Sequence, residues 1–291
     1  MHPENPFSKN YNFNQLVRAY PALEDYIVPG KFGRKSINFA YPEAVESLNR
    51  ALLKWHFDLN WQLKEGNLCP AVPGRFDYLL QVRDLLPRIK DRRVQMLDIG
   101  TGASLIYPLL ATAAFNWDCT ATDVDKESLS FAKGLIRLNK SMRTTTLRRQ
   151  EFKSQVLKGV VEKGDYFDIV VCNPPFYKTK SDAIRQNIRK NKNLHDRERV
   201  DQNFGGFANE LWYKGGEEAF IKTMIAESAL FSQQVLWFTS LVSNKDHIKV
   251  LKRYARKAGA SEIKVLEMEH GNKQSRCIAW RFEQNADEQE I

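Results

Sequence analysis

Segments typical of buried strands alternate with segments typical of helices from residue 94 onwards, and this alternation constrains the fold more than any other feature of the chain. The strand-like segments span residues 94–100, 117–125, 144–149, 167–172 and 233–242. The helix-like segments span residues 103–115, 126–139, 215–231 and 245–260. Such alternation predicts an α/β domain, with a mostly parallel sheet covered by helices on both faces. Two last strand-like segments, 261–269 and 275–282, predict a C-terminal hairpin that adds one antiparallel strand.

The first 90 residues have a different rhythm, which predicts a helical extension. Residues 41–57 follow a helical pattern that starts with Pro42. The apolar stripe of that helix comprises Val45, Leu48, Leu52 and Trp55. Residues 76–86 predict a second helix. The expected organisation is an N-terminal helical extension at 1–90, a sheet domain at 91–284 and a tail at 285–291.

The charge of the chain suits a polyanionic partner. Lys and Arg total 44 against 35 Asp and Glu, a net charge of +9. A surplus of this size is only suggestive, because basic soluble proteins without a nucleic-acid partner are common.

The cysteines and the apolar segments predict a cytoplasmic protein without metal or membrane. The four cysteines are scattered through the chain, and none lies at metal-ligand spacing from another. They are expected to be reduced core residues. The N-terminal sequence MHPENPFSKN contains no apolar leader segment. The longest apolar stretch, near residues 99–115, is too interrupted to span a bilayer.

The sequence LDIGTGAS (97–104), at the end of the first predicted strand, indicates a ligand site. Ligands of open α/β sheets bind at the carboxyl ends of strands, where the strand order reverses. Gly100 and Gly102 allow the backbone to pass close to a ligand. Leu105 stands where a dinucleotide fingerprint has its third glycine, which disfavours a pyrophosphate ligand. S-adenosylmethionine carries no phosphate and therefore fits this loop better than NAD.

Two carboxylates are placed to contact such a ligand. Asp123 ends the second predicted strand and can accept hydrogen bonds from both ribose hydroxyls of an adenosine. Asp98 can orient the glycine loop or meet the cationic amino-acid part of the ligand. The alternative interpretation is a turn with two glycines followed by an acid that caps a helix.

The segment DIVVCNPPFYK (168–178) ends a buried strand abruptly. Pro174 and Pro175 fix two φ angles and remove two backbone donors, and Pro174 pushes Asn173 towards extended backbone. The side-chain carbonyl of Asn173 and the backbone carbonyl of Pro174 can accept hydrogen bonds from the amine of an adenine. They also face the positive charge that grows on that nitrogen during methyl transfer. Phe176 offers a face on which the base can stack.

These four residues, Asn173, Pro174, Pro175 and Phe176, are the predicted catalytic loop. The neutral amide of Asn173 cannot remove a proton, so positioning and electrostatics must carry the reaction. The alternative is a strand-terminating Asn-Pro turn with a phenylalanine that belongs to the core.

The motifs LDIGTGA, ATDVD and CNPPF resemble those of Rossmann-like methyltransferases that act on amino groups. Longer stretches resemble the bacterial ribosomal RNA large subunit methyltransferase F family, which is related to a eukaryotic family acting on U6 small nuclear RNA and mRNA hairpins. These stretches are MHPENPF, LCPAVPGRFDYL (68–79), NFGGFANELWYKGGEEAFIKTMI (203–225), QVLWFTSLVSNK (234–245) and GNKQSRCIAWRF (271–282).

The resemblance implies a Rossmann-like, S-adenosylmethionine-dependent enzyme that methylates N6 of one adenine, number 1618, in 23S ribosomal RNA and releases S-adenosylhomocysteine. It implies cofactor contacts at Arg75, Gly100, Asp123 and Asn173, and more loosely at Ser154. Without the family, Arg75 would pass for a surface arginine after a turn. The expected protein is a monomer whose partner is 23S ribosomal RNA or a partly assembled large ribosomal subunit.

A basic segment directly follows the predicted catalytic loop. Residues 178–199 contain eight Lys and Arg against three acids, and eight minus three gives +5. The segment has almost no apolar anchors, so we expect residues 178–203 to form a loop that is mobile without RNA and clamps RNA beside the site. The alternative is a solvated connection. The predicted RNA contacts are Lys178, Lys180, Arg185, Arg189, Lys190 and Lys192.

The sequence leaves several functions open. The first is an adenine-N6 methyltransferase acting on ribosomal or another structured RNA. The second is a noncatalytic RNA-binding module that keeps the fold. A methyltransferase acting on DNA or on a protein amide is a further alternative. The intact glycine loop beside an intact NPPF sequence favours an RNA methyltransferase.

Overall fold

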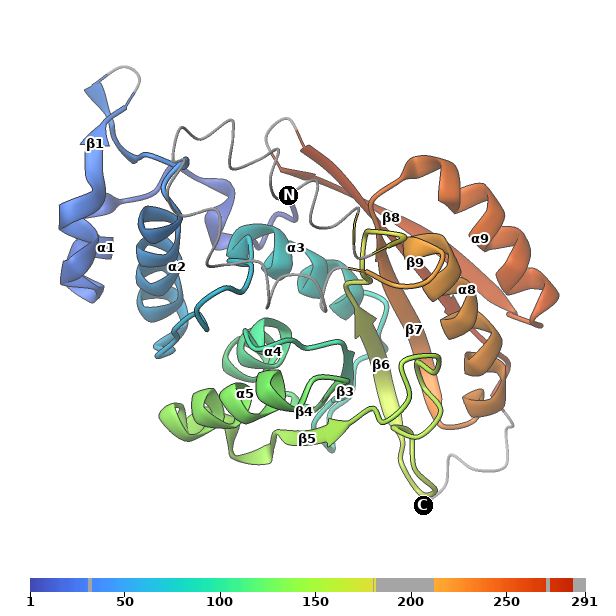
Figure 1. Ribbon diagram of the computed structural model, residues 1–291. Coiled ribbons are helices and arrows are strands. Elements are labelled where there is room, and N and C mark those ends of the chain that lie inside the picture. The colour runs from blue at the N-terminus through green and yellow to red at the C-terminus, as the bar shows by residue number, and fades with distance from the viewer. Residues whose placement is uncertain (31–32, 180, 182–211, 271–272, 285–291) are drawn as a thin grey trace.

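The centre of the molecule is a seven-stranded sheet (Figure 1). The computed structural model describes residues 1–30, 33–179, 181, 212–270 and 273–284. The strand order is β5-β4-β3-β6-β7-β9-β8. The strands are β3 (Gln95–Ile99), β4 (Asp118–Asp123), β5 (Thr146–Arg149), β6 (Phe167–Cys172), β7 (Val235–Val242), β8 (Glu262–His270) and β9 (Lys273–Arg281). The first five pair in parallel, whereas β9 is antiparallel to both of its neighbours. The predicted α/β class, with its antiparallel C-terminal hairpin strand, is confirmed.

Helices cover both faces of the sheet (Figure 1). On one face lie α3 (Val72–Arg83), α4 (Ile106–Phe115) and α5 (Lys126–Leu138). On the other face lie α8 (Gly216–Ser228) and α9 (Lys245–Lys257). The short 3-10 helices η4 (Lys140–Thr144) and η5 (Ala229–Phe231) follow α5 and α8.

The central strands β6 and β7 are mostly apolar because their successive side chains belong to two different cores. In β6, Ile169 and Val171 belong to the core under α3 and α4, whereas Val170 and Cys172 belong to the core under α8 and α9. Trp237 and Phe238 of β7 divide in the same way. A central strand buried on both faces shows no polar alternation. This explains why β6 reads as one continuous apolar run.

The N-terminal extension contains more than the predicted helices. It comprises η1 (Pro6–Ser8), α1 (Phe13–Ala19), η2 (Pro21–Tyr26), β1 (Ile27–Pro29), β2 (Lys35–Ile37), α2 (Pro42–Phe57) and α3. Strands β1 and β2 form an antiparallel hairpin that the sequence interpretation missed. Each strand has three residues and the segment holds Pro29 and Gly30, so it reads as a turn.

The stripe predicted for α2 is partly wrong. Leu48 and Leu52 are buried as expected, but Val45 is only half-buried and Trp55 is 44 % exposed. The buried face is completed by the small residues Ala44 and Ala51. Small residues allow a helix to pack closely, and they carry little weight in an apolar periodicity.

The extension shares one core with the sheet domain. The buried cluster beneath α3 and α4 runs from Phe7 to Ala279 without a break at residue 90. The first residues are also tied to α3, because Asp77 accepts hydrogen bonds from the backbone of His2 at 2.7 Å and from the side chain of Asn5 at 3.0 Å. The domain boundary at residue 90 stays a prediction from the sequence, and the structure has one continuous core across that position.

A buried ion pair fixes the register of the two central strands at their amino ends. Asp168 of β6 has 0 % exposure, and both of its oxygens accept hydrogen bonds from Arg92 at 2.6 Å. The same carboxylate accepts a bond from the backbone nitrogen of Gln95, the first residue of β3, at 2.8 Å. Breaking such a pair leaves an uncompensated buried charge. Because the register of β3 and β6 is fixed, their carboxyl ends, where the predicted site lies, reach the same edge of the sheet.

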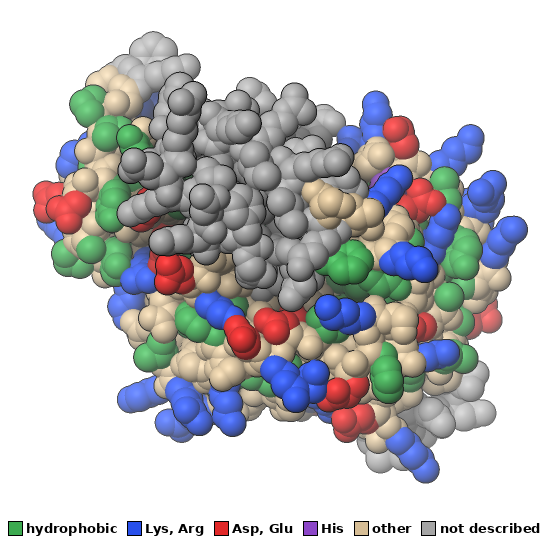
Figure 2. Space-filling view, viewed as in Figure 1, with side chains coloured by type: hydrophobic (Ala, Val, Ile, Leu, Met, Phe, Trp, Pro, Cys, Tyr) green, Lys and Arg blue, Asp and Glu red, His purple; other side chains and the backbone are tan. Residues whose placement is uncertain are grey.

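The surface charge is uneven. In Figure 2, Lys and Arg side chains gather along the right-hand edge of the molecule, where α9 lies in Figure 1. In the described part of the chain, no helix has the length and apolar character needed to cross a membrane.

Candidate active site

The predicted site residues come together at the carboxyl edge of the parallel strands. Strand β3 lies between β4 and β6. The chain leaves β3 towards α4 on one face, and strand order reverses between β3 and β6, as it does at ligand sites of open α/β sheets. The glycine loop follows β3, Asp123 ends β4, and Asn173 follows β6. The motifs are therefore neighbours in space, as the sequence predicted.

The glycine loop has the backbone that its glycines require. Gly100 has φ +72° and Gly102 has φ +60°, both in the left-handed region. The backbone nitrogens of Gly100 and Thr101 each donate to the carbonyl of Thr122 at 2.9 Å. A Cβ added at Gly100 would meet no heavy atom within 4 Å. The loop is thus held against β4 and leaves open space in front of Gly100.

Asp123 anchors this loop from the neighbouring strand. One carboxylate oxygen accepts a bond from the Gly102 nitrogen at 2.8 Å, and the other accepts from the Asp125 nitrogen at 2.9 Å. The side chain is 7 % exposed, and burial raises its pKa above the ordinary value, although these backbone donors oppose that effect. Each carboxylate oxygen has two acceptor positions, so both can still accept a further hydrogen bond.

Asp98 is buried without a partner. It is 1 % exposed, and neither carboxyl oxygen has a hydrogen-bond partner within the described residues. Burial raises the pKa of Asp98 to about 7; the Asp123 charge adds to this effect, whereas the neighbouring Thr101 hydroxyl and the Arg75 guanidinium oppose it. The Thr101 hydroxyl is also buried and unpartnered. An unpaired buried polar group is costly, so this pair of side chains marks a place where a ligand group would be stabilising.

Arg75 reaches the site from the N-terminal extension. It lies on α3 and donates to the Tyr107 hydroxyl of α4 at 2.8 Å, with its guanidinium 5.7 Å from the centre of the Tyr107 ring. Its charge is near enough to act on the pKa values of both Asp98 and Tyr107. Arg75 is half-buried, so it is not the free surface arginine that its position after a turn would suggest.

The NPPF loop leaves the sheet directly after β6. Asn173 is half-buried, and the described residues offer its side chain no hydrogen-bond partner. Pro174 is buried and Pro175 is half-buried. Phe176 is 41 % exposed, so the interpretation of this ring as a core residue is wrong. Tyr177 then pairs with Trp212 in an isolated bridge, and its carbonyl accepts from the Tyr213 nitrogen at 3.0 Å.

A buried hydroxyl chain positions this loop, and the sequence interpretation missed it. The Cys172 nitrogen donates to the Tyr78 hydroxyl at 3.3 Å, and that hydroxyl lies 2.6 Å from Thr239 Oγ1. Because Thr239 gives its only proton to the Val170 carbonyl at 2.7 Å, Tyr78 must donate to Thr239. The signal was present in FDYLL, since a tyrosine within an apolar helix face must find a partner for its hydroxyl.

The predicted contacts at Ser154 and in the basic segment lie outside the glycine loop and the NPPF loop. Ser154 is exposed on the segment between β5 and β6, and Lys178 is exposed just beyond the NPPF loop. Lys180, Arg185, Arg189, Lys190 and Lys192 lie outside the described residues, as does most of the predicted basic loop 178–203 and the tail 285–291.

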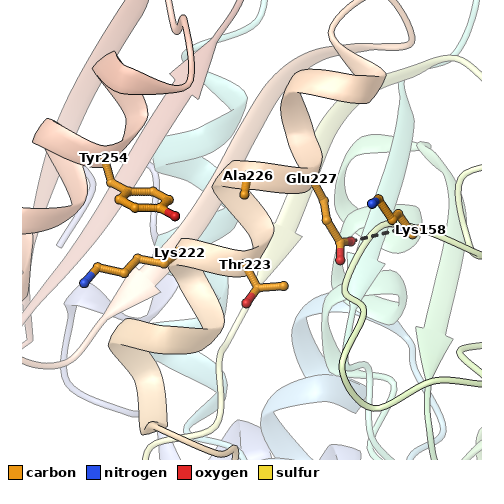
Figure 3. A pocket seen from close by; sticks show the side chains of 6 residues that line it. All are labelled: Lys158, Lys222, Thr223, Ala226, Glu227 and Tyr254. Atoms are coloured by element: carbon orange, nitrogen blue, oxygen red, sulfur yellow. Dashed lines mark hydrogen bonds between the residues drawn. The ribbon is translucent and has the colours of Figure 1, made fainter.

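A concavity lies away from these motifs. It is a shallow groove of about 330 Å³ between α8, α9 and the β5–β6 segment (Figure 3). Its lining residues are Lys158, Lys222, Thr223, Ala226, Glu227 and Tyr254. Glu227 is buried there, and one of its oxygens accepts from the backbone nitrogens of Val156, Leu157 and Lys158 at 2.7–3.0 Å. No predicted site residue lines this groove, and Glu227 has the structural role of capping a turn.

The His, Cys, Asp and Glu side chains of the described residues bear on the kind of ligand that the site can hold. In the described ranges, no cluster of His, Cys, Asp or Glu could hold a metal ion. All four cysteines are free, and three of them are buried. Burial raises the pKa of Cys119 and Cys277 to about 12, which makes both unreactive.

Known proteins resemble this chain over its whole length. A family described as RNA methyltransferase matches residues 1–284. A "Ribosomal RNA large subunit methyltransferase F" from a Psychrobacter species is 41% identical over 97% of this chain and 93% of its own length. The protein of that name from Christiangramia forsetii is 42% identical over 97% of this chain and 100% of its own length.

Solved structures of human proteins are also similar. The hMettl16 catalytic domain in complex with MAT2A 3'UTR hairpin 1 has a TM-score of 0.82 and 29% identity, over 97% of this chain and 96% of that one. The N-terminal domain of human METTL16 in complex with SAH has a TM-score of 0.79 and 27% identity, over 97% and 99% of the two chains. The resemblance inferred from the motifs is confirmed, and with it the expectation of an enzyme. The chain belongs to the RNA methyltransferase family, together with the ribosomal RNA large subunit methyltransferases F.

Proposed function

We propose that this protein methylates N6 of one adenine in 23S ribosomal RNA, with S-adenosylmethionine as methyl donor. The observation that carries the proposal is the juxtaposition of two elements at one sheet edge. One is the open glycine loop with the unpartnered Asp98 carboxylate. The other is the rigid NPPF loop, whose Asn173 amide and Phe176 ring are accessible.

The residues around β3 fit S-adenosylmethionine. When bound, this cofactor supplies a methyl group activated by a positively charged sulfur. Asp98 would pair with its ammonium group and thereby gain the partner that it lacks in the free protein. Arg75, close to Asp98, would hold its carboxylate. The space in front of Gly100 would allow the backbone to approach the ligand.

Asp123 would accept hydrogen bonds from the ribose hydroxyls of the cofactor. Its two oxygens are already held by backbone donors, which fix the carboxylate in one orientation. Such preorganisation reduces the entropy lost on binding. Ser154 would contribute a further cofactor contact, which is proposed from the family resemblance and from its place in the segment that follows β5.

Asn173 and Pro174 would hold the target amine. The side-chain carbonyl of Asn173 and the backbone carbonyl of Pro174 would accept the two N6 hydrogens and stabilise the positive charge that develops there. Pro174 is buried and Pro175 half-buried, so this part of the loop needs little reorganisation during the reaction. The exposed ring of Phe176 would stack on the adenine, an interaction worth about 1–3 kcal/mol.

The substrate assignment is supported by the names of the relatives, which specify ribosomal RNA of the large subunit. Within 23S ribosomal RNA we propose adenine 1618. We further propose that the protein acts as a monomer in the cytoplasm, on the free RNA or on a partly assembled large subunit. The proposed RNA contacts beyond the catalytic loop begin at Lys178.

Mass spectrometry of 23S ribosomal RNA from cells lacking this protein tests the proposal. The fragment that contains adenine 1618 should lose the mass of one methyl group, and purified protein with labelled S-adenosylmethionine should restore it. If the purified protein methylates only a different structured RNA, the enzyme class stands and the substrate is wrong. If it methylates no RNA, the catalytic proposal fails.

A further inference from the structure

The solvent-facing side of α9 carries a row of basic side chains that the proposed catalytic site does not use. Among the 13 residues of α9, Asp246 is the single acid. At about 100° per residue, the basic residues fall within an arc of about 140° on one side of the helix. They are Lys245, Lys249, Lys252, Arg253, Arg256 and Lys257.

These six cations form no ion pair within the described residues. Arg92, Arg148 and Lys222, for comparison, each pair with a carboxylate at short range. A row of unpaired like charges repels itself, and a polyanion removes that repulsion. The row is therefore arranged for an anionic partner outside the chain rather than for the protein's own stability.

The row starts at the edge of the sheet that carries the proposed site. Strand β7 pairs in parallel with β6, and Lys245 follows the end of β7 by three residues. The first turn of α9 thus lies at the same edge as Asn173, and the helix then runs about 20 Å towards the opposite edge. Figures 1 and 2 show this helix and its basic side chains on the outer margin of the molecule.

The start of α9 is firmly held in this place. Glu217 of α8 is 3 % exposed and accepts hydrogen bonds from the backbone nitrogens of Ser243 at 2.7 Å and Asn244 at 3.4 Å. The same carboxylate bonds to His247 Nδ1 at 2.8 Å. The side chain of Asn244 caps the helix through the Asp246 nitrogen at 3.0 Å. The basic row is therefore preorganised, which lowers the cost of binding.

The apolar side of α9 is already in use. Leu251 and Ala255 have 0 % exposure and belong to the core under the helix. A helix that binds a membrane surface needs a free apolar face to insert between lipids. Because α9 has buried that face against the sheet, the basic row acts through charge alone and suits a phosphate backbone.

We propose that α9 is a second RNA contact, which binds phosphates of the substrate beyond the nucleotide that enters the active site. This proposal rests on the proposed function only in taking RNA as the substrate. Each phosphate contact adds about one unit to the slope of log affinity against log salt. The row would therefore give this enzyme affinity for long or folded RNA that a short strand does not show.

Two matched variants test the proposal. The first replaces Lys245, Lys249, Arg253 and Lys257 by Gln, which removes four charges along the row. The control replaces Lys126, Lys133, Arg137 and Lys140 by Gln, which removes the same residue types from the exposed side of α5 and η4 at the other end of the sheet. Glutamine is a good helix former, so both helices should persist, as circular dichroism can verify.

Each protein is titrated across a salt series with a 23S ribosomal RNA fragment of about 100 nucleotides and with an adenine-containing strand of about eight. We expect the α9 variant to bind the long fragment about ten- to a hundredfold more weakly at low salt, with a slope flatter by about three to four units. Binding of the short strand and the turnover of saturating RNA should be unchanged. The control variant should resemble the unaltered protein with both RNAs.

An unchanged slope for the α9 variant overturns the inference, and so does an equal loss in the control, which would show only a general effect of net charge. Loss of binding to a polyglutamate peptide, with RNA binding intact, would assign the row to an acidic protein and also overturn it. If no RNA is methylated but the α9 variant still loses RNA affinity, the proposed function fails and this inference stands.

Discussion

At the residue scale, the site is defined by groups that lack partners. Both oxygens of the buried Asp98 carboxylate lack a hydrogen-bond partner within the described structure, although buried polar groups are ordinarily satisfied. The half-buried Asn173 side chain forms no hydrogen bond with the described residues. Asp123, in contrast, is held by two backbone donors. The sequence motifs located all three residues. Only the tertiary fold shows that Asp123 has hydrogen-bond partners within the protein and that Asp98 has none among the described residues.

Asn173 tests the catalytic proposal most directly. The Asn173→Ala change should lower the single-turnover rate about 100- to 1,000-fold, the effect of losing one preorganised polar group at a developing charge. RNA affinity should change little, because the acceptor matters mainly as charge grows on the amine. Rapid-quench measurements with labelled cofactor would provide the rate. A near-normal rate would remove Asn173 from the chemistry.

Asp98 should make cofactor binding depend on pH. Its pKa of about 7 in the free protein means that the carboxylate needed to pair with an ammonium group is fully formed only above neutrality. The affinity for S-adenosylmethionine should rise about tenfold between pH 6 and pH 8. Calorimetry with Asp98→Asn provides the control, because the cofactor's own ammonium titrates equally with both proteins. A parallel pH dependence in the variant would contradict the assignment.

The same residue should affect stability without cofactor. The pKa of Asp98 is raised from about 4 in the unfolded chain to about 7 in the folded protein. The folded state is therefore stabilised by protonation of Asp98. This contribution to the unfolding free energy is complete below about pH 4 and is lost as the pH rises through about 7. Asp98→Asn should therefore unfold at a higher temperature than the unaltered protein at pH 8. The difference should shrink towards pH 5.

At the element scale, the sequence predicts best those helices and strands whose bounds are set by the residues within and next to them. Strand β6 matches its predicted bounds because apolar side chains fill both cores and two prolines end it. Helix α4 starts at Ile106 rather than at residue 103, because Leu105 adopts a left-handed φ of 49° that no residue pattern announces. The β1–β2 hairpin was missed because its short strands lack a readable periodicity.

The partner of Tyr78 in the link between α3 and the NPPF loop could not be identified from the sequence, because Tyr78 and Cys172 lie 94 positions apart. Removing the Tyr78 hydroxyl tests this link. Tyr78→Phe leaves the buried Cys172 nitrogen without its acceptor, which should cost about 1–3 kcal/mol of unfolding free energy. It should also lower turnover, since Asn173 follows Cys172.

Chemical denaturation and single-turnover assays would measure both effects. Tyr166→Phe is a matched control, because the Tyr166 ring is 38 % exposed and stabilises Arg92 through its face rather than through its hydroxyl. A combined Tyr78→Phe and Thr239→Val protein should lose less than the sum of the single changes, because the two hydroxyls share one bond. Strict additivity would argue against the hydroxyl chain.

At the scale of the whole molecule, the extension and the sheet form one core. The cluster that contains Phe7, Leu48 and Leu80 also contains Ile169 and Ala279. The sequence showed two rhythms and suggested two parts, but contacts between distant segments decide whether the parts can exist separately. Arg75 reaches the site from this extension, so function as well as stability depends on it.

A fragment of residues 91–284 tests this dependence. We expect it to show no cooperative thermal transition, because removal of α2 and α3 takes away a large part of the core that they share with one face of the sheet. A fragment that starts at residue 41 keeps both helices and should unfold cooperatively at a lower temperature than the full chain. Calorimetry of the two fragments gives the answer, and a sharp transition in the shorter one would refute the shared core.

The strand order has a consequence for how the protein is made. Strand β9 is the last strand in the described part of the chain, yet it lies between β7 and β8 and contributes fully buried residues such as Ile278 and Trp280. A nascent chain emerging from the ribosome cannot insert this strand until residue 281 has left the exit tunnel. The N-terminal elements can fold first, but β7 keeps an open edge until β9 has been made and can pair with it. The sheet is thus completed late in synthesis, when β9 enters between β7 and β8.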